Sequence, residues 1–65
     1  MQIILNGTAQ ECTSPNIDHL LTTLELDHNK VVVELNGVII PKEELSKTCL
    51  AANDRLELVQ FVGGG

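Results

Sequence analysis

The residues best placed for chemistry lie at the end of the sequence, where Gly63, Gly64 and Gly65 follow an apolar segment. Glycine has no side chain to pack and reaches a wide range of φ and ψ, so we expect a flexible tail here. Such a tail can enter a narrow channel and present its carboxylate to another protein's active site. On composition alone, a frayed end or a cloning remnant is the simpler explanation.

The other reactive side chains are two cysteines and two histidines. Cys12 and Cys49 lack the short spacing of metal ligands, and neither stands beside a basic residue that would activate its thiol for persulfide chemistry. We therefore expect the cysteines to be small buried apolar residues. His19 and His28 have no serine or cysteine at a recognisable triad spacing. The sequence predicts no metal site and no catalytic group in the body of the chain.

Composition narrows the class of partner. The chain has 65 residues, enough for one small domain, with 4 Lys and Arg against 9 Asp and Glu and a net charge of −5. Phe61 is its sole aromatic residue. The chain therefore has few basic side chains to contact phosphates and few aromatic rings on which bases could stack. This composition argues against nucleic acid as the main partner. No apolar run approaches the roughly 18 residues of a membrane span, and no signal peptide is visible, so the predicted location is cytoplasmic.

Patterning predicts one helix and several strands. After the potential cap Asn16, apolar residues recur at helical spacing up to Leu24, and the helix is expected to end near Leu26-Asp27. Asn-Gly pairs at 6–7 and 36–37 predict tight hairpin turns. The expected strands are 1–6, 8–13, 30–36, 38–40 and 55–62, with a helical turn at 42–45.

One helix on one sheet makes a two-layer α+β domain, and the helix can cover only one face of that sheet. Strand alternation assigns Ile4, Val32, Val59 and Phe61 to the uncovered face, and Val62 follows them at the base of the tail. If these strands are neighbours, the residues form an apolar patch for a protein partner. Scattered apolar residues, which any protein surface carries, are the alternative.

Two blocks of the sequence resemble the ThiS family of thiamine-biosynthesis sulfur carriers. One is Asn-Gly-Val-Ile-Ile-Pro at 36–41, and the other is Val-Gln-Phe-Val-Gly-Gly-Gly at 59–65. The N-terminal Met-Gln-Ile-Ile-Leu-Asn-Gly and the helix Asn-Ile-Asp-His-Leu-Leu fit the same family, so the likeness covers the whole chain. Leu45, where an aromatic residue is common, and Asn53-Asp54, in place of a Gly-Asp turn, depart from the pattern.

The resemblance implies a ubiquitin-like β-grasp fold: a mixed sheet of four to five strands, with the first and last strands parallel at its centre and one main helix packed on one face. The domain would span residues 1–62, and Gly63–Gly65 would be the flexible tail.

The resemblance also implies the chemistry. A ThiF-type adenylyltransferase, which resembles ubiquitin-activating enzymes, would use ATP with Mg²⁺ to join the Gly65 carboxylate to AMP. Persulfide sulfur derived from cysteine would convert the adenylate to a thiocarboxylate, and a ThiG-type thiazole synthase would place that sulfur in the thiazole ring of thiamine. The carrier would be a co-substrate with no cofactor of its own, and not an enzyme.

Three alternative functions stay open at this point. The small subunit of molybdopterin synthase shares the fold and the tail chemistry, but that family often has a Pro-Pro pair where this chain has 60–62 as Gln-Phe-Val. A ubiquitin-like modifier would undergo the same activation and then form an isopeptide bond with a lysine. A passive interaction domain would use the tail for nothing.

Overall fold

The computed structural model describes residues 1–61, which form five strands, one α-helix and one 3₁₀ turn. Along the chain these are β1 (Gln2–Leu5), β2 (Thr8–Glu11), α1 (Ile17–Thr23), β3 (Val31–Leu35), β4 (Val38–Ile40), η1 (Lys42–Glu44) and β5 (Arg55–Gln60). Residues 62–65, which include Val62 and the three glycines of the predicted tail, lie outside the described part.

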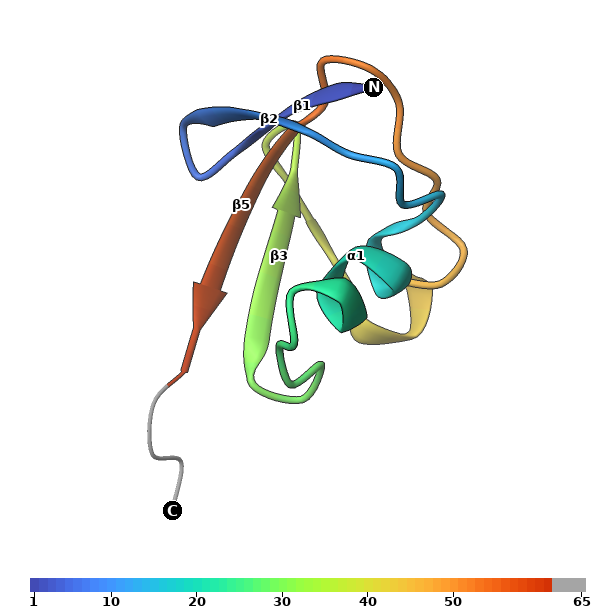
Figure 1. Ribbon diagram of the computed structural model, residues 1–65. Coiled ribbons are helices and arrows are strands. Elements are labelled where there is room, and N and C mark those ends of the chain that lie inside the picture. Colours follow the sequence, from blue (N-terminus) through green and yellow to red (C-terminus); the bar gives the residue numbers. More distant parts are fainter. Residues whose placement is uncertain (62–65) are drawn as a thin grey trace.

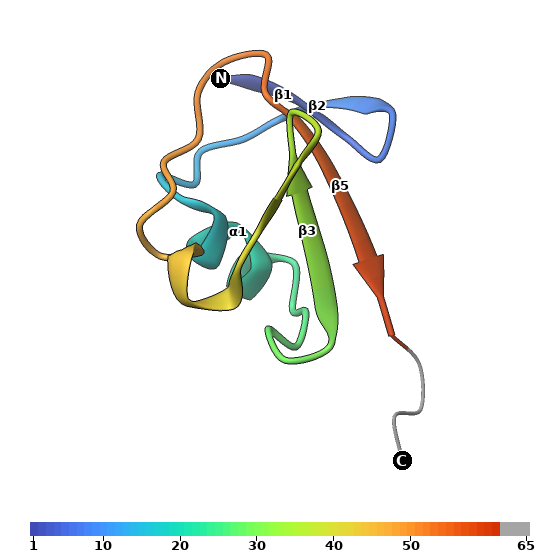
Figure 2. The same ribbon diagram turned by 180° about the vertical axis from the view of Figure 1, so that it is seen from behind.

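The five strands form one mixed sheet in the order β2-β1-β5-β3-β4 (Figure 1). The first strand, β1, and the last strand, β5, run parallel, and every other neighbouring pair is antiparallel. The helix α1 lies on one side of this sheet, as the view from behind also shows (Figure 2). The β-grasp arrangement predicted from the sequence is therefore confirmed, with β5 as the central strand.

Both hairpins turn on an Asn-Gly pair, as predicted. Asn6 and Gly7 have φ of 48° and 80°, and Asn36 and Gly37 have φ of 51° and 88°, as type I′ turns require. Each asparagine side chain also bonds to the central strand. Asn6 accepts a hydrogen bond from the backbone N–H of Leu58 at 2.8 Å. Asn36 accepts one from that of Arg55 at 2.9 Å, so both turns are fastened to β5.

The helix begins as predicted, because the Asn16 side chain accepts a hydrogen bond from the His19 N–H at 2.7 Å. Its predicted end near Leu26-Asp27 is wrong, since α1 stops at Thr23. The Glu25 N–H donates to the Thr22 carbonyl and the Leu26 N–H to the Leu21 carbonyl, which together make a Schellman motif. Glu25 takes the left-handed conformation there, with φ of 59°, where glycine is usual.

The core lies between α1 and the face of the sheet that it covers, called here the inner face. Its largest fully buried side chains are those of Ile3, Ile17, Leu21, Val33 and Leu56. The three strand residues in this set have the inward orientation that alternation predicts. The opposite face, called the outer face, has no helix over it within residues 1–61.

Four strands are shorter than predicted, and the first of them, predicted at 1–6, spans Gln2–Leu5. The return strand of the first hairpin ends at Glu11, although the Cys12 N–H still donates to the Met1 carbonyl at 2.7 Å, in register with the ladder. The strand predicted at 30–36 spans Val31–Leu35. The last strand ends at Gln60, and the final residue predicted for it, Val62, lies outside the described residues.

The described part of the chain contains no helix with the length and apolar character needed to cross a membrane.

Candidate functional site

The register of β3 against β5 orders the side chains of the outer face. Lys30 accepts a backbone hydrogen bond from Phe61 at 2.7 Å, and Asn36 donates one to Arg55 at 2.8 Å. Every second pair of an antiparallel ladder is hydrogen-bonded. The two pairs between these ends that point outward, Val32 with Val59 and Glu34 with Glu57, are therefore hydrogen-bonded pairs as well. From the end of β5 toward its start, the outward pairs are first apolar, then acidic, and the last pair is Asn36 with the cationic Arg55.

Val32, Val59 and Phe61 form the apolar end, called here the apolar strip. Val32 and Val59 are directly opposite each other, and Phe61 follows two residues after Val59 with the same outward orientation. Val59 is 58% exposed and Phe61 is 51% exposed, whereas Leu56 on the inner face of the same strand is fully buried. The strip therefore leaves large apolar side chains in water at the point where β5 ends.

The structure does not bring Ile4 into this strip. Ile4 is half-buried and pairs with Arg55 across the parallel β1–β5 ladder. Arg55 is four residues before Val59 on β5, so Ile4 lies beside the start of that strand and not beside Val59. Four strand residues span about 13 Å, so the predicted patch of four neighbouring side chains is wrong in this respect. The register between β1 and β5 could not be predicted from the sequence, because most of the chain lies between these two parallel strands. The partner-binding role of these residues stays a prediction.

One exposed apolar residue of the outer face was missed. Ile39 on β4 is 64% exposed and pairs with Glu34, so it shares the outward orientation of that carboxylate. The signal was present in the sequence, because a two-residue Asn36-Gly37 turn pairs residue 35 with 38 and residue 34 with 39.

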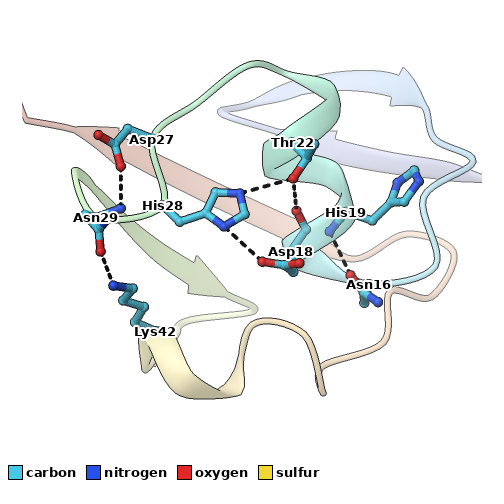
Figure 3. A network of polar contacts seen from close by, with 8 residues as sticks. All are labelled: Asn16, Asp18, His19, Thr22, Asp27, His28, Asn29 and Lys42. Atoms are coloured by element: carbon cyan, nitrogen blue, oxygen red, sulfur yellow. Dashed lines mark hydrogen bonds and ion pairs between the residues drawn. The ribbon is translucent and has the colours of Figure 1, made fainter.

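The histidines have structural partners around the helix (Figure 3). His28 contacts the Asp18 carboxylate through Nδ1 at 2.9 Å and the Thr22 hydroxyl through Nε2 at 3.3 Å. In the same loop, Asn29 donates its N–H to the Asp27 side chain at 2.8 Å. These contacts fasten the segment between α1 and β3 to the helix, close to Lys30, whose carbonyl holds Phe61.

One contact has the residue types of a nucleophilic pair. His19 Nδ1 lies 2.9 Å from the Ser14 hydroxyl oxygen, a pairing that the sequence spacing did not indicate. Ser14 is buried, and no acidic side chain among the described residues contacts His19. Catalysis by serine needs an accessible hydroxyl and an oriented base, so this pair serves packing around the start of α1.

The cysteines show no arrangement for metal binding or redox chemistry. Cys12 is buried, Cys49 is exposed, and neither forms a disulfide. Among residues 1–61, no three His, Cys, Asp or Glu side chains are grouped closely enough to hold a metal ion. Cys49 is therefore not the buried apolar residue that the sequence predicts, although it joins Asn16 in an isolated bridge between backbone segments.

Comparison with known proteins gives the same family that the two sequence blocks indicate. The ThiS family model matches residues 3–65, which is nearly the whole chain. The sulfur carrier protein ThiS of Bacillus subtilis is 43% identical over 49 residues, which cover 75% of this chain and 74% of that protein.

A thiazole synthase from Paramagnetospirillum magneticum is 36% identical over 66 aligned residues. That match covers 100% of this chain and only 20% of the synthase, so the chain spans one fifth of that relative's length. In that organism, a region similar to the whole of this chain is therefore part of a protein named for the synthase.

The fold comparison agrees with the sequence comparison. The crystal structure of the thiamine biosynthesis protein ThiS from Geobacter metallireducens superposes with a TM-score of 0.84 at 30% sequence identity, covering 100% of both chains. The family match, the carrier relative and this structure lead to one conclusion: the chain belongs to the ThiS family, the small sulfur carriers of thiamine biosynthesis.

Proposed function

We propose that this protein carries sulfur as a thiocarboxylate on Gly65, the last residue of its sequence. The observation that carries this proposal is the way the central strand ends. Strand β5 leads through Phe61 to Val62 and the three glycines, while the described body holds no metal cluster of its own. Support for the role of a co-substrate, and not of an enzyme, comes from the family of small sulfur carriers to which the chain belongs.

The chemistry follows from the weakness of a carboxylate as an electrophile. Its negative charge and resonance repel a nucleophile, so the Gly65 carboxylate must first be joined to AMP, with release of pyrophosphate from ATP. A ThiF-type adenylyltransferase supplies this step and binds the ATP and Mg²⁺. The carrier itself needs no cofactor for it.

Sulfur then replaces the adenylate. The terminal sulfur of a cysteine-derived persulfide attacks the acyl carbon, AMP leaves, and an acyl disulfide forms. A thiolate attacks the other sulfur of this disulfide, which releases the thiocarboxylate and leaves the two thiol groups joined as a disulfide.

The acceptor of this sulfur is, in our proposal, a ThiG-type thiazole synthase. Support comes from the Paramagnetospirillum magneticum protein, which is named thiazole synthase and includes a region similar to this whole chain. Placing a carrier and its acceptor in one chain raises their effective concentration for each other. A carrier that is not joined to its acceptor must meet it through a surface, for which the apolar strip is the candidate in this chain.

The test is the intact mass of the chain after incubation with ATP, Mg²⁺, the adenylyltransferase of the same organism and a persulfide donor. We expect a gain of one sulfur atom less one oxygen atom. A variant without Gly65 is the matched control and should keep its fold and gain no mass. A gain of one whole sulfur would indicate a persulfide on Cys12 or Cys49 and contradict the proposal.

The same experiment separates the rival functions. A protein modifier would give conjugates of high mass with other proteins, through isopeptide bonds to lysine. An unchanged mass with an active adenylyltransferase would support a passive domain. Transfer of the loaded sulfur to a molybdopterin precursor, and not to thiazole synthase, would assign the chain to molybdopterin synthesis.

A further inference from the structure

Two carboxylates of the outer face lie side by side and form no ion pair among the described residues, although the cationic Arg55 has the same outward orientation two residues before Glu57. Glu34 on β3 lies directly opposite Glu57 on β5, as a hydrogen-bonded pair whose Cα atoms are about 5.5 Å apart. Neither side chain has an ion-pair partner within 4.0 Å in the described part of the chain. Like charges directly opposite each other on a sheet destabilise it, so this pair does not serve the stability of the fold.

The acidic pair adjoins the apolar strip. Val32 and Val59 occupy the next outward-facing row, and Phe61 follows in the row beyond. An apolar centre bordered by polar and charged groups is the usual composition of a protein interface. Because the two charges are negative and the chain carries a net charge of −5, the complementary surface is cationic.

The length of the tail places a partner over this part of the sheet. Gly65 is the fourth residue after Phe61, and four fully extended residues span at most about 14 Å. An enzyme that takes up Gly65 must therefore reach to within that distance of Phe61. An interface of about 800 Å² on each partner, if round, has a radius of about 16 Å. Glu57 is four strand residues from Phe61, which is about 13 Å, so an interface of this size centred on Phe61 would cover it.

We propose that Glu34 and Glu57 together bind one arginine of thiazole synthase when the apolar strip docks on that enzyme. A guanidinium has five N–H donors in a planar fork and can donate to both carboxylates at once. The inference rests on the proposed function. Thiazole synthase is the occupant because a protein named for that enzyme contains a region similar to this whole chain, which brings the two together in that relative.

The experiment measures the affinity of thiazole synthase from the same organism for the full chain by calorimetry. The test variant combines Glu34→Gln and Glu57→Gln, which keep the side-chain shape and remove both charges. The matched control combines Glu25→Gln and Glu43→Gln, which remove two exposed charges that lie outside the strands and form no ion pair in the described region.

We expect the test variant to raise Kd about tenfold or more in about 50 mM NaCl, and the control to raise it less than about twofold. The difference should shrink in about 500 mM NaCl, because salt screens the charges. Thermal unfolding should show that the test variant is at least as stable as the parent chain, since the repulsion between the two carboxylates is gone.

Three results would overturn the inference. These are equal losses of affinity in the two variants, a loss confined to binding of the adenylyltransferase, and a loss confined to self-association of the chain. The thiocarboxylate assay on the parent chain is read separately. If the parent gains sulfur and the two variants bind thiazole synthase with equal affinity, the proposed role of the acidic pair is refuted and the carrier function stands.

Discussion

The two faces of the sheet are built from the same strands but differ in burial and in the kind of side chain that they carry. On β3, Val33 is 1% exposed beneath α1, while its neighbour Val32 faces outward. On β5, Leu56 is buried in the core, while Glu57 and Val59 face outward. The buried strand residues of the inner face are apolar and hold the fold. The outer face combines exposed apolar side chains with paired like charges, an arrangement that is costly in isolation and typical of surfaces that bind a partner.

The largest effect is expected from Leu56→Ala, which empties a fully buried site on the central strand. It should lower the free energy of unfolding by about 2–5 kcal/mol, because both transfer energy and a cavity are involved. A domain of this size rarely has more than about 3–5 kcal/mol of stability, so much of the variant should be unfolded. Chemical denaturation followed by circular dichroism measures this, with Val59→Ala as the control on the opposite face.

The sharpest comparison uses adjacent valines. Val33→Ala should cost about 2 kcal/mol, since it removes two buried methyl groups at about 0.8 kcal/mol each and leaves a cavity. Val32→Ala should cost less than about 1 kcal/mol, because its side chain is only half-buried. Denaturant titration of the two variants under one condition gives both values. Equal costs would show that the outer face also contributes to the core and would break the contrast between the faces.

A smaller effect of opposite sign is expected where the helix over the inner face ends. Glu25→Gly should raise the free energy of unfolding by about 0.5–1 kcal/mol, because glycine adopts the left-handed conformation without a Cβ clash and loses part of that gain to its freer unfolded state. Thr23→Gly, placed inside the helix, is the matched control and should destabilise by up to about 1 kcal/mol. A destabilised Glu25→Gly variant would mean that the glutamate makes a compensating contact.

The smallest effect on stability is expected from Phe61→Asp. Its side chain is half exposed beyond the end of β5, so the free energy of unfolding should change by no more than about 0.5 kcal/mol. Affinity for the adenylyltransferase or for thiazole synthase should fall, because an apolar contact is replaced by a charge. Calorimetry with both enzymes tests this, and unchanged affinity for both would remove Phe61 from the docking surface.

The fold could be predicted because local signals agreed with one another. Two Asn-Gly turns set the hairpin registers, the cap at Asn16 set the start of the helix, and alternation separated the inner from the outer side chains. The end of the helix could not be predicted, because a glutamate occupies the position where glycine usually signals a Schellman motif.

The candidate site was predicted only in part, for reasons of geometry. The pairing of Val32 with Val59 and the place of Ile4 both depend on registers between strands distant in sequence, which no turn between them fixes. The acidic pair of Glu34 and Glu57 was invisible for the same reason. Ile39, in contrast, was readable from its hairpin and was overlooked.

The central claim is that sulfur is attached to the end of the chain and to no side chain of the body. Fragmentation of the sulfur-loaded protein in a mass spectrometer tests this most directly. We expect the replacement of one oxygen by sulfur in the fragments that contain Gly65, and unchanged masses in the fragments that contain Cys12 or Cys49. Sulfur found on a fragment with either cysteine, with an unmodified Gly65, would contradict the account.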